Sequence, residues 1–219
     1  MQKRYNCVIF DLDGTVLDTI ADLAAATNHA LKKYGHPQHS VEAVRRMVGN
    51  GVANLILRAT PEGTPEAERA EILAEFKAYY RDHINDSTCP YEGIPALLKA
   101  LREAGVYVGI NSNKFDAALQ SLCKIHFDGL YDYAVGESEL TPKKPDPTAA
   151  ERIMAAAGAG KAETIYIGDS DVDIQTGKKA GVDQAWVSWG FRRKEEMDGV
   201  EIPLAFDSTD ALRSFLLCE

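Results

Sequence analysis

Acidic, hydroxyl and amide side chains follow three short apolar runs of the chain. The runs are Cys7–Phe10, Val106–Ile110 and Thr164–Ile167. The polar residues after them are, in the same order, Asp11 with Asp13, Ser112 with Asn113, and Asp169 with Asp173. If each run is a strand of one parallel sheet, the carboxyl ends meet at a single edge, where ligands bind in such sheets. We therefore expect these side chains to share one site.

A site of this composition suits phosphoryl transfer. Clustered carboxylates repel each other and need a cation between them, and an oxygen-rich pocket favours Mg²⁺. A serine hydroxyl and a lysine ammonium can bind the oxygens of a phosphoryl group. One aspartate can attack phosphorus, while a second protonates the leaving oxygen and activates water. The lysine would be Lys143 or Lys144, in the proline-rich segment 142–147.

The elements that must position these residues fall into two patterns. From residue 90 onward, strand-like and helix-like segments alternate, which predicts a doubly wound, Rossmann-like α/β core with a parallel sheet. Residues 16–89 instead show helical periodicity, interrupted by glycine and proline, that predicts four helices. We therefore expect a core of residues 1–15 and 90–219, with residues 16–89 inserted as a helical domain after the first strand.

Four motifs in this order resemble the haloacid dehalogenase superfamily of phosphatases over almost the whole chain. They are D-x-D-G-T at residues 11–15, a serine, a Lys-Pro pair, and G-D-x-x-x-D at residues 168–173. The resemblance implies that Asp11 is a nucleophile that becomes phosphorylated and is also a Mg²⁺ ligand. Asp13 would be the general acid/base and bind Mg²⁺ through its backbone carbonyl, and Thr15 would brace the Asp13 loop. Haloacid dehalogenases proper lack the second aspartate, so Asp13 favours phosphoryl transfer.

The same resemblance assigns roles to the remaining site residues. Ser112 would bind the transferring phosphoryl group, helped by the backbone at Asn113. Lys144 directly precedes Pro-Asp-Pro, as the family's lysine does, and would balance charge on the nucleophile and the phosphate. Asp169 would ligate Mg²⁺, and Asp173 would support the metal shell and Lys144. The core strands would lie in the order 5-4-1-2-3.

Within this superfamily the helical insertion resembles a cap domain, and three elements resemble phosphoglycolate phosphatases. These elements are the Gly49, Asn50 and Gly51 sequence, the Asn113-Lys114 pair, and the loop at 189–192. The implied role of the cap is a lid that excludes water and contacts the leaving group. Arg46, Asn50 and Arg58 are possible cap contacts. The Gly-Asn-Gly sequence also fits a plain helix–helix turn.

Composition excludes several other classes of protein. The formal net charge of -9 argues against nucleic acid as a partner, since such binders neutralise phosphates with Lys and Arg. No apolar stretch has the length of a membrane span, and the first residues do not resemble a signal peptide. The four cysteines are widely spaced, which is typical of free thiols in the cytoplasm. The sequence leaves open a monomer or a homodimer.

Several functions remain open on this scaffold. The leading prediction is Mg²⁺-dependent hydrolysis of a small phosphorylated metabolite, with phosphoglycolate as the first candidate. A phosphosugar mutase of the β-phosphoglucomutase type is the first alternative, and a pyrophosphatase or nucleotidase is the second. A binding protein that has lost turnover is the third, although no expected catalytic residue is missing.

Overall fold

The computed structural model describes residues 3–197 and 199–218. The chain divides into a core unit, Met1–Leu17 with Pro90–Glu219, and a helical unit, Asp18–Cys89. The first boundary falls two residues after the predicted one, at the short strand β2 (Leu17–Asp18), and the second falls at β3 (Cys89–Pro90).

Six parallel strands form the sheet of the core unit. They are β1 (Cys7–Phe10), β4 (Tyr107–Phe115), β5 (Tyr133–Glu137), β6 (Thr164–Gly168), β7 (Asp183–Val187) and β8 (Ala205–Phe206). Their order is β5-β4-β1-β6-β7-β8. Strands 1 to 5 of the predicted order are β1, β4, β5, β6 and β7, because β2 and β3 do not belong to this sheet. Read from the β7 side, the observed order is the predicted 5-4-1-2-3, with β8 added beside β7. The predicted doubly wound α/β core is therefore confirmed.

The register of the central strands brings the polar strand ends to one level. Phe10 of β1 pairs with Ile110 of β4 on one side and with Ile167 of β6 on the other. Asp11 follows directly, and its N–H donates to the Ile167 carbonyl at 2.8 Å. The predicted end of the second strand at Ile110 is wrong, because β4 continues to Phe115. Its polar residues remain largely buried there, and the register with β5 shifts between residues 111 and 115.

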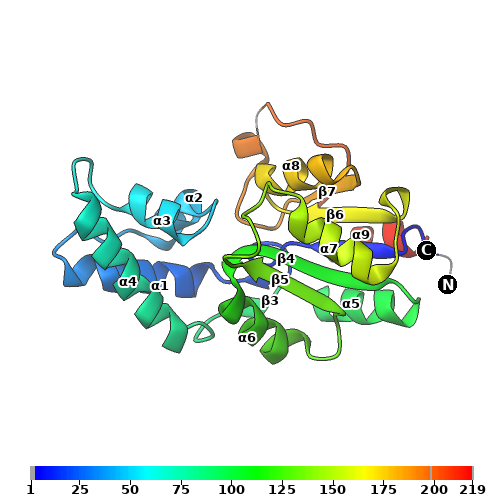
Figure 1. Cartoon of the computed structure of the whole chain (residues 1–219), viewed down its shortest axis with the longest axis horizontal. Coiled ribbons are helices and arrows are strands. Elements are labelled where there is room, and N and C mark those ends of the chain that lie inside the picture. Colours follow the sequence, from blue (N-terminus) through cyan, green and yellow to red (C-terminus); the bar gives the residue numbers. More distant parts are fainter. Residues whose placement is uncertain (1–2, 198, 219) are drawn as a thin grey trace. The chain divides into compact units, whose positions relative to one another are not determined.

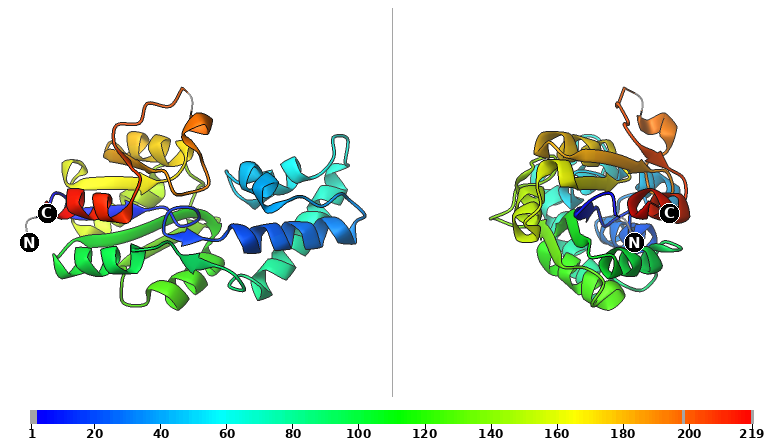
Figure 2. Two further views of the ribbon diagram at one scale, coloured as in Figure 1. Left: turned by 180° about the vertical axis from the view of Figure 1, so that it is seen from behind. Right: turned by 90° about the vertical axis from the view of Figure 1, so that its right-hand side faces the viewer.

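Helices cover both faces of this sheet. One face carries α5 (Ile94–Glu103), α6 (Asp116–Phe127) and α9 (Thr209–Leu217), and the other carries α7 (Thr148–Ala157) and α8 (Asp171–Ala180) (Figures 1 and 2). Two short 3-10 helices, Lys161–Glu163 and Lys194–Met197, lie in the connections. The packing under α7 is close, because a Cβ added at Gly109 of β4 would lie 2.4 Å from Ile153 Cγ2. β1 is therefore buried on both faces, as its continuous apolar sequence predicts.

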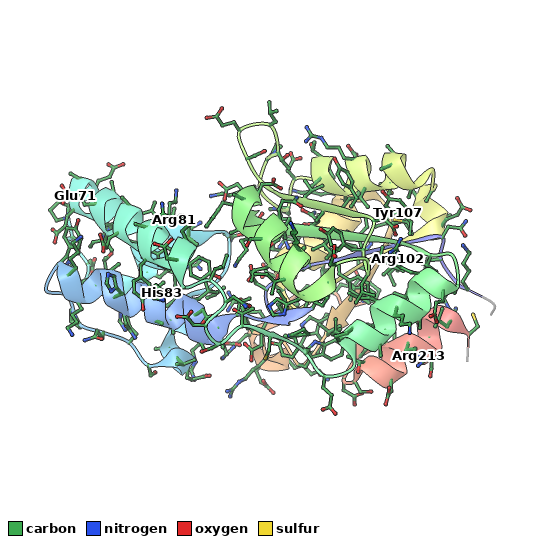
Figure 3. All side chains as sticks on the ribbon, turned by 90° about the horizontal axis from the view of Figure 1, so that it is seen from below. Glu71, Arg81, His83, Arg102, Tyr107 and Arg213 are labelled. Carbon is green, nitrogen blue, oxygen red and sulfur yellow. The ribbon has the colours of Figure 1, made fainter. Side chains whose placement is uncertain are left out.

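The helical unit contains the four predicted helices. They are α1 (Ile20–Lys33), α2 (Val41–Met47), α3 (Val52–Ala59) and α4 (Glu66–Asp82). The charge-rich helix α4 buries a narrow stripe of Ile72, Phe76 and Tyr80, while Glu71 and Arg81 are exposed on it (Figure 3). None of the helices within residues 3–197 and 199–218 combines the length and the apolar character that a bilayer-crossing helix needs.

A buried carboxylate ties the two ends of the helical unit together. Asp22 of α1 accepts hydrogen bonds from the backbone N–H groups of Ser87 and Thr88 at 2.8–3.1 Å. It also accepts one from the Thr88 hydroxyl at 2.7 Å. Hydrogen bonds to a charged acceptor are stronger than neutral ones, and their loss would leave buried donors without a partner. Asp22 thus fixes the returning chain against the start of α1.

We predict that Asp22→Ala lowers the free energy of unfolding by about 3 kcal/mol. Asp22→Asn, which keeps one acceptor oxygen, should lose less. The measurement is urea unfolding followed by circular dichroism, with Asp82→Ala at an exposed position of α4 as the matched control. Equal effects of Asp22→Ala and Asp82→Ala would contradict this role for Asp22.

Candidate active site

The end of β1 places Asp11 in a buried turn. Asp11 is 6% exposed, and the Leu12 carbonyl after it accepts the N–H groups of Thr15, Val16 and Leu17 at 3.0–3.2 Å. Gly14 closes the turn with a φ of +87°, where a side chain is strained. A Cβ at this position would also lie 2.4 Å from Asp169 Oδ2. The glycine of the D-x-D-G-T motif therefore lets the loops after β1 and β6 approach each other.

Lys144 reaches the center of the site. Its Nζ lies 2.7 Å from Asp11 Oδ1 and 2.7 Å from Asp173 Oδ1, and its side chain is buried. Lys143 was the alternative candidate for the site lysine in the sequence. It pairs instead with Glu137 at 3.1 Å and is partly exposed. The structure therefore places Lys144, and not Lys143, beside the predicted nucleophile.

Three buried carboxylates converge at this point. Oxygens of Asp11, Asp169 and Asp173 lie within 4.8 Å of one another. Asp173 is already engaged, because its Oδ1 bonds Lys144 and its Oδ2 accepts from the Ser170 N–H at 3.1 Å and the Ser170 hydroxyl at 2.6 Å. Asp173 thus serves both as part of the capping box of α8 and as a partner of Lys144. This leaves Asp11 and Asp169 as the side chains best suited to a cation.

The electrostatics of the cluster favour a bound divalent cation. Burial, with the neighbouring Asp173 and Asp169, holds the pKa of Asp11 well above its usual range, against the opposing effect of Lys144. Burial and Asp173 raise the pKa of Asp169 to about 7, although the backbone amides of Phe191 and Arg192 oppose this change. One lysine does not compensate three buried carboxylates. A hard cation with oxygen ligands would, so the residues present fit Mg²⁺.

The polar end of β4 is bonded to both neighbouring loops. The Ser112 hydroxyl accepts from the Lys114 N–H at 3.1 Å and lies 3.5 Å from Asp13 Oδ2. The Asn113 side chain forms a two-way amide pair with Lys144, accepting from its N–H at 2.7 Å and donating to its carbonyl at 3.2 Å. The side chain of Asn113 therefore anchors the Lys144 loop, and the phosphoryl contact predicted for its backbone stays a prediction.

Sequence reasoning gave no role to Lys114, although the structure puts it in the site. Its Nζ lies 2.8 Å from Asp13 Oδ1, and its side chain is only 3% exposed. A buried lysine is rare unless it is paired. The signal in the sequence was a lysine directly after Ser112 and Asn113, but the identity of its partner depends on the turn that carries Asp13.

Thr15 and the loop after β7 complete the surroundings of the site. Thr15 is fully buried, and its carbonyl accepts the indole N–H of Trp189 at 3.0 Å. Its own N–H donates to the Leu12 carbonyl, so Thr15 contacts both sides of this turn through its backbone, and the predicted role of Thr15 in bracing the Asp13 loop stays a prediction. The Phe191 N–H donates to Asp169 Oδ2 at 2.6 Å.

Three of the predicted cap residues lie in the loop between α2 and α3 of the helical unit, while Arg46 lies on α2 and Arg58 on α3. Gly49, Asn50 and Gly51 have φ values of +132°, +60° and +85° between α2 and α3. Arg58 donates to the carbonyls of Met47 at 2.7 Å and Gly49 at 3.1 Å. Arg58, suggested as a possible substrate contact, therefore holds the loop in shape. The exposed Arg46 is paired with Glu42 at 3.2 Å on α2.

We predict that Asp169→Asn stabilises the protein when divalent cations are removed. Because the pKa of Asp169 is raised from 3.8 to about 7 by folding, the folded state binds more protons between these values. Stability is therefore lost as the pH rises across this range, and the variant escapes that loss. The Tm difference, variant minus wild type, should grow from about pH 4 to about pH 7 in chelator.

Scanning calorimetry checks this prediction, with Asp210→Asn at an exposed position of α9 as the control. Added Mg²⁺ should raise the Tm of the wild type more than that of Asp169→Asn. A Tm difference that does not change with pH would show that folding does not raise the pKa of Asp169.

Comparisons with known proteins agree with this geometry. The family model described as haloacid dehalogenase-like hydrolase matches residues 8–187. A curated phosphoglycolate phosphatase of Pseudomonas putida is 34% identical over 94% of this chain and 77% of its own length. One of Aquifex aeolicus is 31% identical over 84% of this chain and 85% of its own length.

This chain superposes with a TM-score of 0.94 on a solved structure from Lactobacillus delbrueckii subsp. bulgaricus. That protein is provisionally named a phosphoglycolate phosphatase. It is 33% identical and covers 99% of this chain and 100% of its own. The family model matches most of the chain, and the fold and the acidic site agree with that match. The chain belongs to the haloacid dehalogenase-like hydrolase family.

Proposed function

We propose that this chain is a phosphatase that hydrolyses a small phosphomonoester through an acyl phosphate on Asp11. The observation that carries the proposal is the pair between Lys144 Nζ and Asp11 Oδ1 at 2.7 Å, inside a buried cluster with Asp169 and Asp173. A lysine in this place can offset the charge of the attacking carboxylate and of the incoming phosphoryl group. Asp13 lies two residues further on the same turn, which suits a separate acid/base role.

The proposed reaction has two steps. A carboxylate oxygen of Asp11 attacks phosphorus, the bond from phosphorus to the ester oxygen breaks, and that oxygen takes a proton from Asp13. Asp13 then accepts a proton from water, which attacks phosphorus and releases inorganic phosphate while the Asp11 carboxylate is restored. The intermediate splits one difficult displacement into two easier ones. Protons and phosphoryl oxygens balance across the cycle without any further reactant.

Other residues hold the reacting groups in place in this scheme. Ser112 and the backbone at Asn113 bind the phosphoryl oxygens together with Lys144, and Asp173 keeps Lys144 oriented through its 2.7 Å contact. Lys114 holds the Asp13 carboxylate through the contact at 2.8 Å. Restraining an acid/base group near the leaving oxygen lowers the entropy loss on reaching the transition state.

A Mg²⁺ ion would be held by the side chains of Asp11 and Asp169 and by the Asp13 carbonyl. When bound, it would supply positive charge that offsets the carboxylates and the phosphoryl oxygens. The cluster holds an excess of buried negative charge that Lys144 alone does not balance, and this excess supports a bound cation.

Phosphoglycolate is the leading substrate in this proposal, because the curated relatives from Pseudomonas putida and Aquifex aeolicus carry the name of that activity. We propose that the helical unit acts as the cap domain and excludes water from the acyl phosphate. Gly49, Asn50 and Arg46 are proposed to contact the leaving group. The Arg58 bonds to the Gly49 carbonyl would preserve the shape of that loop.

A panel of phosphate esters tests this proposal directly. We expect phosphoglycolate to be hydrolysed faster than hexose phosphates, pyrophosphate or nucleotides. EDTA should remove the activity and Mg²⁺ should restore it, because the acidic cluster needs a cation. Isomerisation of a hexose phosphate without phosphate release would favour the mutase, and inactivity on every ester with Mg²⁺ present would favour a binding protein. Turnover unaffected by EDTA would contradict the metal proposal.

Asp11→Asn should lower kcat on the order of 1,000-fold or more, since an amide cannot act as the nucleophile. The variant should stay folded, because Lys144 retains Asp173 as a partner and the loss of one buried charge relieves repulsion. Phosphate release is the assay, and circular dichroism checks the fold. Asp210→Asn is the control for a charge change at the surface. Retention of most activity would refute Asp11 as the nucleophile.

A further inference from the structure

Both tryptophans of the chain donate to backbone carbonyls of the two acidic loops. The Trp186 indole N–H donates to the Asp169 carbonyl at 2.8 Å, and that of Trp189 donates to the Thr15 carbonyl at 3.0 Å. Trp186 lies on β7, and Trp189 lies two residues after its end. One segment therefore contacts the loop after β1 and the loop after β6 at the same time.

The same segment also bonds the carboxylate of Asp169 itself. The N–H of Phe191, a buried residue, donates to Asp169 Oδ2 at 2.6 Å. This contact fixes the rotation of the side chain that is best placed, with Asp11, to bind a cation. A hydrogen bond from a backbone group that is itself held by packing orients a metal ligand more firmly than solvent can.

Gly190 lies very close to both the loop after β1 and the loop after β6. A Cβ added there would lie 2.2 Å from the Gly14 carbonyl oxygen and 2.3 Å from Asp169 Cβ. Gly190 is not in the left-handed region of φ that favours glycine, so alanine is disfavoured by space alone. The neighbouring atoms are a backbone oxygen, the first carbon of the Asp169 side chain and, at 2.6 Å, its Oδ2, and they cannot move aside without moving the site.

We propose that Trp186, Trp189, Gly190 and Phe191 are positioning residues that together hold the Asp169 carboxylate and the Asp13–Thr15 turn in the arrangement that binds a divalent cation. We call these four residues the brace. The proposal deepens the function proposed above and rests on its metal dependence. None of these four residues is a predicted metal ligand or reacting group, yet together they hold the cation site in shape before a cation binds.

The brace predicts a specific loss of metal affinity. Gly190→Ala should raise the Kd for Mg²⁺ by about 10- to 100-fold, the usual effect of removing the support of a metal ligand. Trp189→Phe keeps an aromatic ring and removes the indole N–H, so its Kd should rise by about fivefold, as for the loss of one hydrogen bond. Gly160→Ala is the matched control, because Gly160 is exposed with a φ of −79° and its added Cβ would meet only a Glu163 oxygen at 3.3 Å.

Isothermal titration calorimetry with Mg²⁺ on the full chain, without substrate, measures the Kd values. The Tm of each variant in EDTA is recorded beside them, because a merely structural role would lower that Tm and leave the Kd unchanged. Raised Kd values for Gly190→Ala and Trp189→Phe, with Gly160→Ala like the wild type, support the brace. If Gly190→Ala does not fold, Trp189→Phe decides.

The test separates the brace from the proposed function. Wild-type Kd values in both variants would overturn the brace and leave the metal-dependent phosphatase standing. A wild-type protein that binds no Mg²⁺ would overturn both the brace and the metal proposal. Activity at saturating Mg²⁺ is measured separately, so a defect in turnover cannot be mistaken for a defect in metal binding.

Discussion

Repulsion among Asp11, Asp169 and Asp173 is the constraint on which the rest of the site depends. Burial makes this repulsion strong, since little water screens charges inside the protein. Lys144 lies against two of the three carboxylates and offsets part of their charge. Burial, together with this remaining excess of negative charge, raises the pKa values of Asp11 and Asp169. The same excess suits the site to a divalent cation.

The fold keeps these charges together because the backbone supplies the geometry. β1 lies between β4 and β6 with aligned ends, so loops that are distant in the sequence leave the sheet at one level. Glycine at positions 14 and 190 allows the loops to approach more closely than any side chain would permit. Capping of α8 by Ser170 and Asp173 serves folding and the site at once. The residues that build the helix start are thus the residues that orient Lys144.

Much of the core site could be predicted from the sequence, because its residues stand at the ends of apolar runs. Asp11, Ser112 and Asp169 are brought to one edge, as their positions suggested, and Lys144, which was predicted from the family resemblance, reaches the same site. Lys114 was not assigned a role, since a lysine looks solvated until the turn that carries Asp13 is in place. The contacts of Trp186 and Trp189 were equally hidden, because an indole in a loop after a strand gives no sign of which carbonyl it will meet. Cap loop residues carry weaker patterns, and Arg58 proved to hold a turn.

The central claim is that Asp11 carries the phosphoryl group during turnover. Rapid acid quenching of the enzyme with phosphoglycolate and Mg²⁺, followed by borohydride reduction and peptide mass spectrometry, tests it most directly, because an acyl phosphate is reduced and a free carboxylate is not. The account predicts reduction of Asp11 alone, dependent on substrate. Reduction at Asp13 or Asp169 instead, or none at Asp11 while phosphate is being released, would contradict it.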